Sequence, residues 1–198
     1  VLIAVVERGD EVYIPDGNFE LKARDEISIV GTPAKTIEFF KKLGVPTSSA
    51  RDALIVGGGR TSVYLAKQLL EMGIRVKIVE RDEERCEELN EMVPKAMIIC
   101  GDATDKDLLI EEGLLETEAF VATTNFDEEN IMLALFAKSL SSAKLITKVH
   151  RISYDDIIDQ LDVGSIIYPK FITSESIIKY VRAMKNSMGS NIETLYRL

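Results

Sequence analysis

Three consecutive glycines, Gly57–Gly59, limit the fold of this 198-residue chain more than any other feature. They follow the apolar segment Ala53–Val56 and precede the segment Thr61–Met72, which is predicted to be helical and to end at Gly73. An apolar run bounded by glycine is typical of a buried strand. A strand that turns through glycine straight into a helix is the opening unit of a parallel α/β sheet.

The chain after Asp52 continues this alternation of strands and helices. Helices are predicted after Asp82 and over Asp105–Glu112, and a long one starts at the cap Asn125 with Glu128 as its capping-box partner. Another helix opens at Ser153 with Asp156. Further strands are predicted at Arg75–Glu80, Ala96–Cys100, Ala119–Thr123, Leu145–Val149 and Ser165–Tyr168. Six strands rich in Val, Ile and Leu predict a Rossmann-like, doubly wound parallel sheet.

The first 45 residues have a different pattern of predicted elements, which is typical of a small α+β lobe. Val1–Glu7 and Val12–Ile14 are predicted as short strands, and Phe19–Leu21 and Glu26–Val30 follow. Thr32 and Pro33 then start a helix as N-cap and first residue. The polar stretch Pro46–Arg51 is predicted to be the linker. Because the chain begins inside a strand and has no initiator Met, we expect it to be a piece of something longer.

Composition excludes several classes of protein. The chain is 46% hydrophobic and 29% charged, which is ordinary for a globular protein and too apolar for disorder. A net charge of −9 disfavours nucleic acid as a partner. The longest fully apolar run, Ile131–Ala137, falls far short of a membrane span, so no direct membrane insertion is expected. Two cysteines, Cys86 and Cys100, cannot form a disulfide framework and are interpreted as buried packing residues in a reducing compartment.

The glycine turn is a near match to the dinucleotide fingerprint. Gly57 allows the tight turn, and Gly59 lets the backbone approach a pyrophosphate at the start of the helix, where free N–H groups point. Ser62 stands where a third glycine normally packs helix against strand, so we expect it to loosen that contact slightly. The position between a strand and a helix makes this motif more specific than its glycines alone.

Glu80 closes the next strand, about 23 residues after Gly57, where this fold places an acid against ribose hydroxyls. A carboxylate there repels a 2′-phosphate, so NAD, ADP or ATP is favoured over NADP. The alternative is a surface acid at a strand end. Arg81 flanks the adenine or is simply solvated.

Polar residues also follow the remaining strands at the edge where such sheets bind ligands. Each could be only a turn or a helix cap. They are Gly101–Thr104, Thr123–Asn125 and Lys148–Arg151. His150 is the only histidine, and no His/Cys cluster suggests a metal site. No catalytic residue is expected.

With these residues in place, the chain resembles the RCK-containing peripheral subunits of Trk potassium-uptake systems. The resemblance rests on three segments and covers nearly the whole chain. They are Val56–Arg60 with Tyr64–Leu69, Gly101–Asp102–Ala103–Thr104, and Thr124–Met132. It implies a partial RCK C-lobe at 1–45, a nucleotide-binding N-lobe at 51–170, a crossover helix at 171–188, and the truncated entry to a further C-lobe at 189–198.

The resemblance also implies a function. Such subunits bind NAD(H), or alternatively ADP or ATP, and lie on the cytoplasmic, inner face of the cell membrane. They form dimers and then rings on a membrane potassium-translocating subunit, and nucleotide binding changes potassium flux. The carried-over contacts are the phosphate loop Gly57, Gly58, Gly59, Arg60 and Thr61, then Glu80 and Arg81, then Asp102, Ala103 and Thr104, and less firmly Thr123, Asn125 and Lys148.

Two alternatives stay open: a fragment of an NAD-dependent oxidoreductase, and a scaffold that has lost nucleotide binding through Ser62. The last predicted helix, Ile172–Met188, carries an apolar seam of Ile177, Val181, Met184 and Met188. That seam packs either on its own domain or on a partner.

Overall fold

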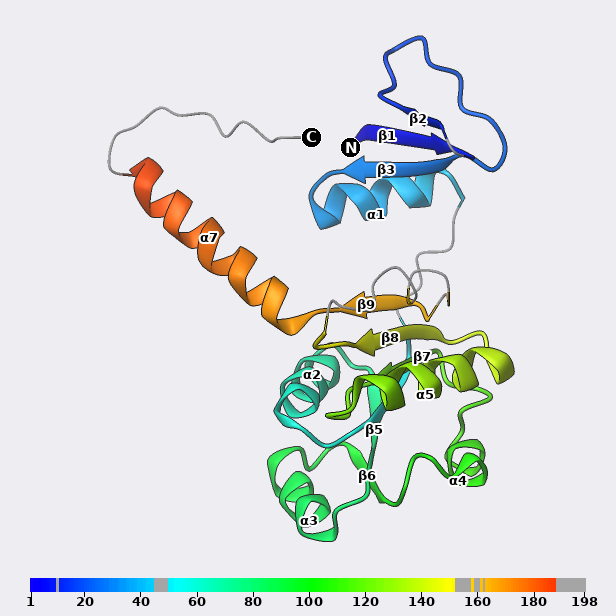
Figure 1. Ribbon diagram of the computed structural model, residues 1–198, viewed down its shortest axis with the longest axis vertical. Coiled ribbons are helices and arrows are strands. Elements are labelled where there is room, and N and C mark those ends of the chain that lie inside the picture. The colour runs from blue at the N-terminus through cyan, green and yellow to red at the C-terminus, as the bar shows by residue number, and fades with distance from the viewer. Residues whose placement is uncertain (10, 45–49, 152–157, 159–160, 162, 188–198) are drawn as a thin grey trace. The chain divides into compact units, whose positions relative to one another are not determined.

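The structure is a computed structural model in which the chain divides into two units, Val1–Ser49 and Ala50–Leu198 (Figure 1). It describes residues 1–198 except 10, 45–49, 152–157, 159–160, 162 and 188–198. The start of the helix predicted from Ser153 and the segment 189–198 therefore lie outside the described residues. The predicted linker Pro46–Arg51 does so for all but its last two residues.

The first unit is a small antiparallel sheet followed by one helix. Strand β1 (Leu2–Arg8) lies in the middle and pairs with β2 (Glu11–Tyr13) on one side and β3 (Glu26–Val30) on the other. Helix α1 (Pro33–Lys42) begins as predicted, with Thr32 as N-cap and Pro33 in the first turn.

Arg8 organises the loop between β2 and β3, where we had predicted a strand at Phe19–Leu21. The Arg8 guanidinium pairs with both oxygens of Asp25, at 2.7 and 2.8 Å, and lies over the rings of Tyr13 and Phe19. Phe19 therefore serves as a packing residue for Tyr13, with ring centroids 5.4 Å apart, and forms no strand in the described structure.

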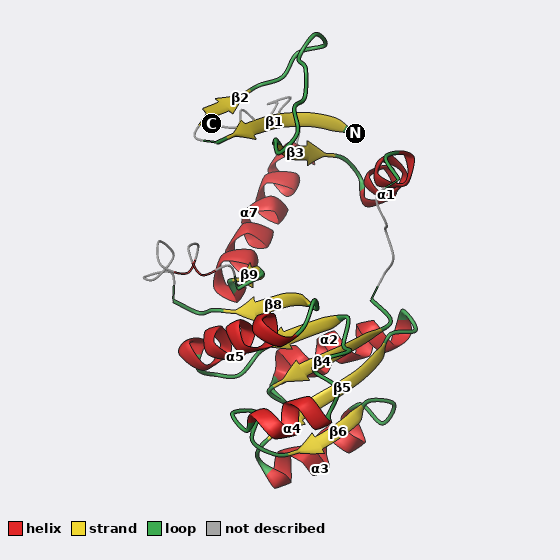
Figure 2. Cartoon of the chain, turned by 90° about the vertical axis from the view of Figure 1, so that its right-hand side faces the viewer, coloured by secondary structure: helices red, strands yellow, loops and turns green. Residues whose placement is uncertain are grey.

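The second unit contains a six-stranded parallel sheet in the order β6-β5-β4-β7-β8-β9 (Figure 2). This is the doubly wound arrangement predicted from the sequence, with its topological switch point between β4 and β7. The strands are β4 (Asp52–Val56), β5 (Arg75–Glu80), β6 (Met97–Cys100), β7 (Ala119–Ala122), β8 (Lys144–Lys148) and β9 (Ser165–Ile167).

Helices cover both faces of this sheet because its strands are apolar on both sides. One core joins Ile55 and Ile78 to α2 (Arg60–Glu71) and α3 (Glu83–Met92). The other core joins Leu54 and Phe120 to α4 (Lys106–Glu111) and α5 (Asp127–Leu140). Adjacent residues of β4 thus serve opposite layers, and the carboxyl ends of the strands stay open.

The last helix, α7 (Pro169–Ser187), extends away from this sheet (Figure 1). Its large apolar side chains are exposed within the chain, at 57% for both Ile177 and Val181 and 50% for Met184. Met188, the fourth residue of the predicted seam, lies outside the described residues. The exposure of the described seam argues against the interpretation that it packs on its own domain.

Two local predictions were wrong. Helix α5 begins at Asp127 with Phe126 as its N-cap, so Asn125 does not cap it and Glu128 forms no capping box. The Thr124 hydroxyl accepts the Phe126 N–H at 3.2 Å, which adds a turn before the helix. Cys100 is exposed, because it ends the edge strand β6.

Cys86 is buried as predicted, and its thiol donates to the Glu80 carbonyl at 3.3 Å. Burial raises the pKa of the Cys86 thiol to about 12.

The Arg8–Asp25 pair makes the first unit sensitive to acid. The Arg8 guanidinium and the Lys22 N–H lower the pKa of the Asp25 carboxyl from 3.8 to about 2. This pair should therefore stabilise the unit fully above pH 4, and the contribution should vanish as the pH falls toward 2. Carbon-13 titration of the side-chain carboxyl should show a midpoint near 2. A midpoint near 3.8, or unchanged acid sensitivity in Asp25→Asn, would contradict this assignment.

Candidate functional site

A cavity of about 240 Å³ opens at the carboxyl ends of β4, β5, β6 and β7. It lies over the topological switch point, where sheets of this order bind ligands. Most of the site residues predicted from the sequence line it: Gly57, Gly58, Gly59, Glu80, Arg81, Asp102, Ala103, Thr123 and Asn125. Gly101 and Thr124, which the sequence placed at this edge without assigning them a contact, line it too, and Asp82, Phe126 and Glu129 are lining residues that were not predicted.

Gly57 makes the tight turn that brings β4 into α2. Its φ is +95°, a conformation that residues with a Cβ rarely adopt. A Cβ at this position would also lie 2.9 Å from the backbone nitrogen of Thr124. The Gly57 N–H donates to the Val79 carbonyl at 2.9 Å, which continues the β4–β5 ladder into the loop. The turn therefore requires glycine for two independent reasons.

The peptide of Gly58 is held from both sides. Its N–H donates to Glu80 Oε2 at 2.6 Å, and the carbonyl oxygen of Gly58 accepts from Arg85 Nε at 2.8 Å. The other Glu80 oxygen accepts the Asp82 N–H at 3.0 Å. Hydrogen bonds to charged groups are the stronger kind in proteins. Glu80 and Arg85 thus fix the loop to β5 and α3. The sequence pattern did not predict this role for Arg85.

Gly59 is the open position of the loop. It is the N-cap of α2, and a Cβ built there would meet nothing within 4 Å. The first N–H groups of a helix have no intrahelical acceptor, and the helix dipole adds positive potential at the same place. The loop therefore leaves open space beside Gly59, at the end of the helix where a phosphate would be held. The residues present therefore fit the phosphate group that the sequence motif implies.

Ser62, which we expected to loosen the contact between helix and strand slightly, is held by hydrogen bonds at this position. The side chain is fully buried, its hydroxyl donates to the Gly57 carbonyl, and its oxygen lies 2.9 Å from Thr123 Oγ1. The Thr123 hydroxyl in turn donates to the Val56 carbonyl at 2.8 Å. These two hydroxyls link the end of β4 to the end of β7, so hydrogen bonds replace the close contact that a third glycine would make.

A compact turn forms the opposite wall of the cavity. Asp102 Oδ1 accepts both the backbone N–H and the hydroxyl of Thr104, each at 2.8 Å. These bonds lower the pKa of the Asp102 carboxyl, so it stays ionised. Ala103 is buried within the turn. Thr104 itself does not line the cavity, because its side chain is used to hold Asp102.

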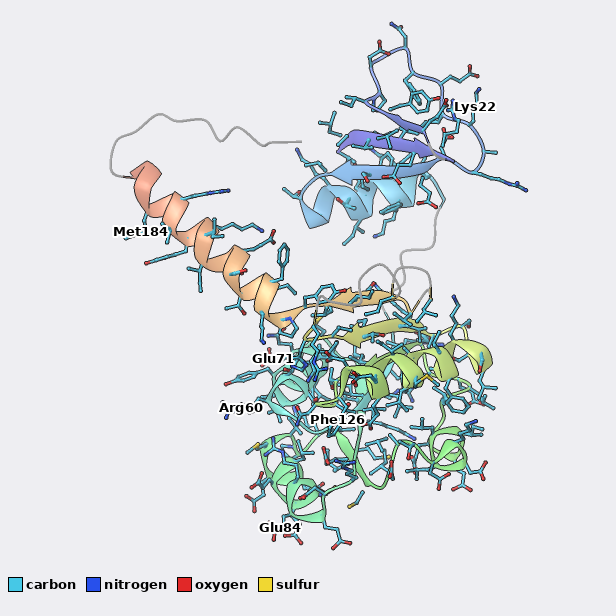
Figure 3. All side chains as sticks on the ribbon, viewed as in Figure 1. Lys22, Arg60, Glu71, Glu84, Phe126 and Met184 are labelled. Atoms are coloured by element: carbon cyan, nitrogen blue, oxygen red, sulfur yellow. The ribbon has the colours of Figure 1, made fainter. Side chains whose placement is uncertain are left out.

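The other three predicted residues outside the lining are Arg60, Thr61 and Lys148. Arg60 and Thr61 are exposed at the start of α2, and Figure 3 labels Arg60 there. Lys148 is buried beneath the edge, and its ammonium donates to the Thr123 carbonyl at 2.8 Å. Burial lowers the pKa of this ammonium. Lys148 supports the strand end from below the cavity.

Two buried polar residues at the start of α5 anchor the rim of the site. The Asp127 carboxylate accepts the backbone N–H groups of His150 and Arg151 and contacts His150 Nδ1 at 3.0 Å. These bonds keep the pKa of Asp127 below its usual value despite burial. The Asn130 side chain accepts from the Thr124 N–H and donates to the Lys148 carbonyl. The segment from β7 to α5 is therefore rigidly tied to the end of β8.

The cavity is acidic although the loop suits an anion. Its lining side chains include the carboxylates of Glu80, Asp82, Asp102 and Glu129, against the single guanidinium of Arg81. Any phosphate must therefore be held by local N–H groups, because the surrounding side-chain charge opposes it. In the part of the chain that the structure describes, no cluster of His, Cys, Asp or Glu could hold a metal ion. Nor does any helix in that part have the length and apolarity to cross a membrane.

The strand order, the glycine turn at the switch point and the acid at the end of the second strand define a Rossmann-like fold of the nucleotide-binding class. Comparison with known families then identifies its kind. The TrkA-N domain model matches residues 53–169, and the TrkA-C domain model matches residues 1–44. The chain belongs to the TrkA-N domain family. Its TrkA-N domain is preceded by a TrkA-C segment.

Relatives and solved structures agree with this assignment. The chain is 33% identical over 193 residues to a "Trk system potassium uptake protein TrkA homolog" of Archaeoglobus fulgidus, covering 98% of this chain and 44% of that protein. The chain spans less than half the length of the curated relatives it matches.

The fold is also similar to the TrkA-N domain of the inner membrane protein ybaL from Escherichia coli, with a TM-score of 0.60, 18% identity, and coverage of 68% and 98% of the two chains. A structure described as the GsuK channel bound to NAD has a TM-score of 0.54 at 17% identity, covering 68% of this chain and 25% of that one.

Gly58 and Gly59 offer a matched test of the loop. Gly58→Ala should lower the free energy of unfolding by about 1–3 kcal/mol, because overpacking shifts neighbouring groups. The added Cβ would lie 2.5 Å from Leu89 Cδ1 and 2.9 Å from Glu80 Oε2. Gly59→Ala meets open space and should cost at most about 1 kcal/mol, from weaker helix capping. Urea unfolding monitored by circular dichroism distinguishes the two, and equal losses would contradict the clamped geometry.

Proposed function

We propose that the chain is the nucleotide-sensing part of a regulatory subunit of a potassium-uptake system, without catalytic activity. One observation carries the proposal: the Gly58 peptide is clamped by Glu80 and Arg85 while Gly59 and the first turn of α2 stay open. A loop held this way leaves the N–H groups from Gly59 onward for a phosphate, and because the loop is already ordered, binding costs less ordering. Glu80 would take the ribose, with Arg81, Asp102 and Ala103 on the adenine side.

The names of the relatives support the potassium-uptake part of this proposal, since several are called Trk system potassium uptake protein. We assign residues 1–45 to a partial C-lobe, 51–170 to the N-lobe and 171–188 to a crossover helix. The exposed apolar side chains of α7 are consistent with a dimer through that helix. The complete subunit would form a ring on the cytoplasmic face of a membrane potassium-translocating protein. Nucleotide would gate potassium flux by binding two ring conformations unequally.

The acidic lining favours NAD(H) over ADP and ATP as the nucleotide. All three share adenosine and a diphosphate linkage, so the loop can treat them alike. They differ in charge, which rises in magnitude from the dinucleotide to ATP. Four carboxylates around one guanidinium should penalise the more anionic ligands. A structure described as the GsuK channel bound to NAD has a similar fold, which supports NAD(H) as a candidate ligand.

Calorimetry with NADH tests the proposal directly. The chain should bind NADH and should not reduce any carbonyl substrate offered with it. Turnover would favour the oxidoreductase alternative. If NAD, NADH, ADP and ATP all fail to bind at millimolar concentration, the alternative of a scaffold that has lost nucleotide binding is favoured instead.

Glu80→Ala should weaken NADH binding by about 1–3 kcal/mol, because one change removes the ribose acceptor and releases the Gly58 N–H. Glu87→Ala is the matched control, since Glu87 is an exposed acid on α3 that does not line the cavity. An unchanged dissociation constant in Glu80→Ala would mean that Glu80 has a structural role only and does not contact the ligand.

The dependence on ligand charge gives a separate prediction. At low ionic strength NADH should bind more tightly than ADP, and ADP more tightly than ATP. The differences should shrink as salt screens the lining carboxylates. Tighter binding of ATP than of NADH at every salt concentration would contradict the electrostatic argument.

A further inference from the structure

Phe126 is a large apolar side chain held in an exposed position at the cavity rim. It is 53% exposed, yet its backbone is firmly placed as the N-cap of α5. Its N–H donates to the Thr124 hydroxyl at 3.2 Å, and its carbonyl accepts the Asn130 N–H at 3.0 Å. Figure 3 labels it near the start of that helix. Among the described residues that line the cavity, it is the only aromatic one.

The ring of Phe126 is covered on one side by Arg81. The Arg81 guanidinium carbon lies 5.8 Å from the ring centroid, within the range of a cation–π contact. The two residues come from different loops, since Arg81 follows β5 and Phe126 follows β7. Their contact therefore spans the mouth of the cavity between its two halves.

The position of Arg81 decides which part of a nucleotide this contact would meet. Arg81 follows Glu80 directly. Its charge contributes to lowering the pKa of Asp102, which follows β6 on the same side of the cavity. The Phe126 ring therefore faces the half formed by β5 and β6. If Glu80 takes the ribose, the attached base lies in the same half. A planar base can stack on a phenyl ring and on a guanidinium alike.

We propose that Phe126 and Arg81 form the adenine-stacking site of this cavity, with Phe126 as the platform and Arg81 as the movable cover. This inference rests on the proposed nucleotide-binding function and adds a residue that determines affinity for the base. In the ligand-free protein Arg81 shields the apolar ring. On binding, adenine takes the ring face, and the guanidinium moves aside or stacks on the base.

The test is calorimetry of the 198-residue chain with ADP, NADH and inorganic pyrophosphate. Phe126→Ala and Phe126→Leu should weaken ADP and NADH binding by roughly 5- to 150-fold, the range that removing base–aromatic stacking covers. Phe126→Tyr keeps the ring and should stay within about threefold of the wild type. Pyrophosphate lacks a base, so its binding should be the same in all four proteins.

Tyr64→Ala is the matched control, because Tyr64 is an aromatic residue on α2, 68% exposed, that does not line the cavity. It should leave all three ligands unaffected. Thermal melting of each variant checks the fold, and Phe126→Leu, which removes the ring but keeps an apolar side chain, preserves the test if Phe126→Ala unfolds.

The outcomes separate this inference from the proposed function. Normal wild-type binding with unchanged affinity in Phe126→Ala and Phe126→Leu overturns the stacking site alone. Weakened NADH binding with unchanged ADP binding overturns the placement of adenine on Phe126, because both ligands carry that base. If the wild-type chain binds no nucleotide, the proposed function fails, and the stacking site fails with it.

Discussion

The clamp on the Gly58 peptide is the interaction on which the rest of the site depends. A carboxylate from the end of β5 takes its N–H, and a guanidinium from α3 donates to its carbonyl. Each bond involves a charged group, for which a typical contribution is about 1.5–3 kcal/mol. Together they tie the β4–α2 turn to the neighbouring strand and helix. Gly59, the N-cap of α2, is thereby left to face the cavity at the helix end where the first N–H groups have no intrahelical acceptor.

The same clamp explains how an acidic protein can suit an anionic ligand. The chain carries a net charge of −9, and carboxylates outnumber guanidinium groups around the cavity. Long-range attraction therefore contributes nothing favourable. In the proposed function, recognition would come from short-range donors, namely helix N-terminal N–H groups, and from stacking of the base. Such a site discriminates between ligands by their charge as well as their shape.

Much of the fold followed from the sequence, because apolar strands, glycine turns and helix caps are local signals. Gly57 and Glu80 were found from spacing alone, and the structure places both at the cavity. Arg85 and Phe126 were missed because their roles depend on contacts between elements far apart in sequence. Asn125 was misplaced as a cap, since the Thr124 hydroxyl and the tether of Asp127 to His150 decide where α5 begins. Cys100 was misjudged because strand order, which makes β6 an edge, cannot be seen from residue type.

A crystal structure of the chain grown with NADH would show directly whether the clamped loop holds a nucleotide. We expect density for the pyrophosphate at Gly59 and the first turn of α2, with the Gly58 peptide still held between Glu80 and Arg85. A nucleotide bound elsewhere, or a Gly58 peptide that has turned away from Glu80 to reach the phosphate, would contradict this expectation.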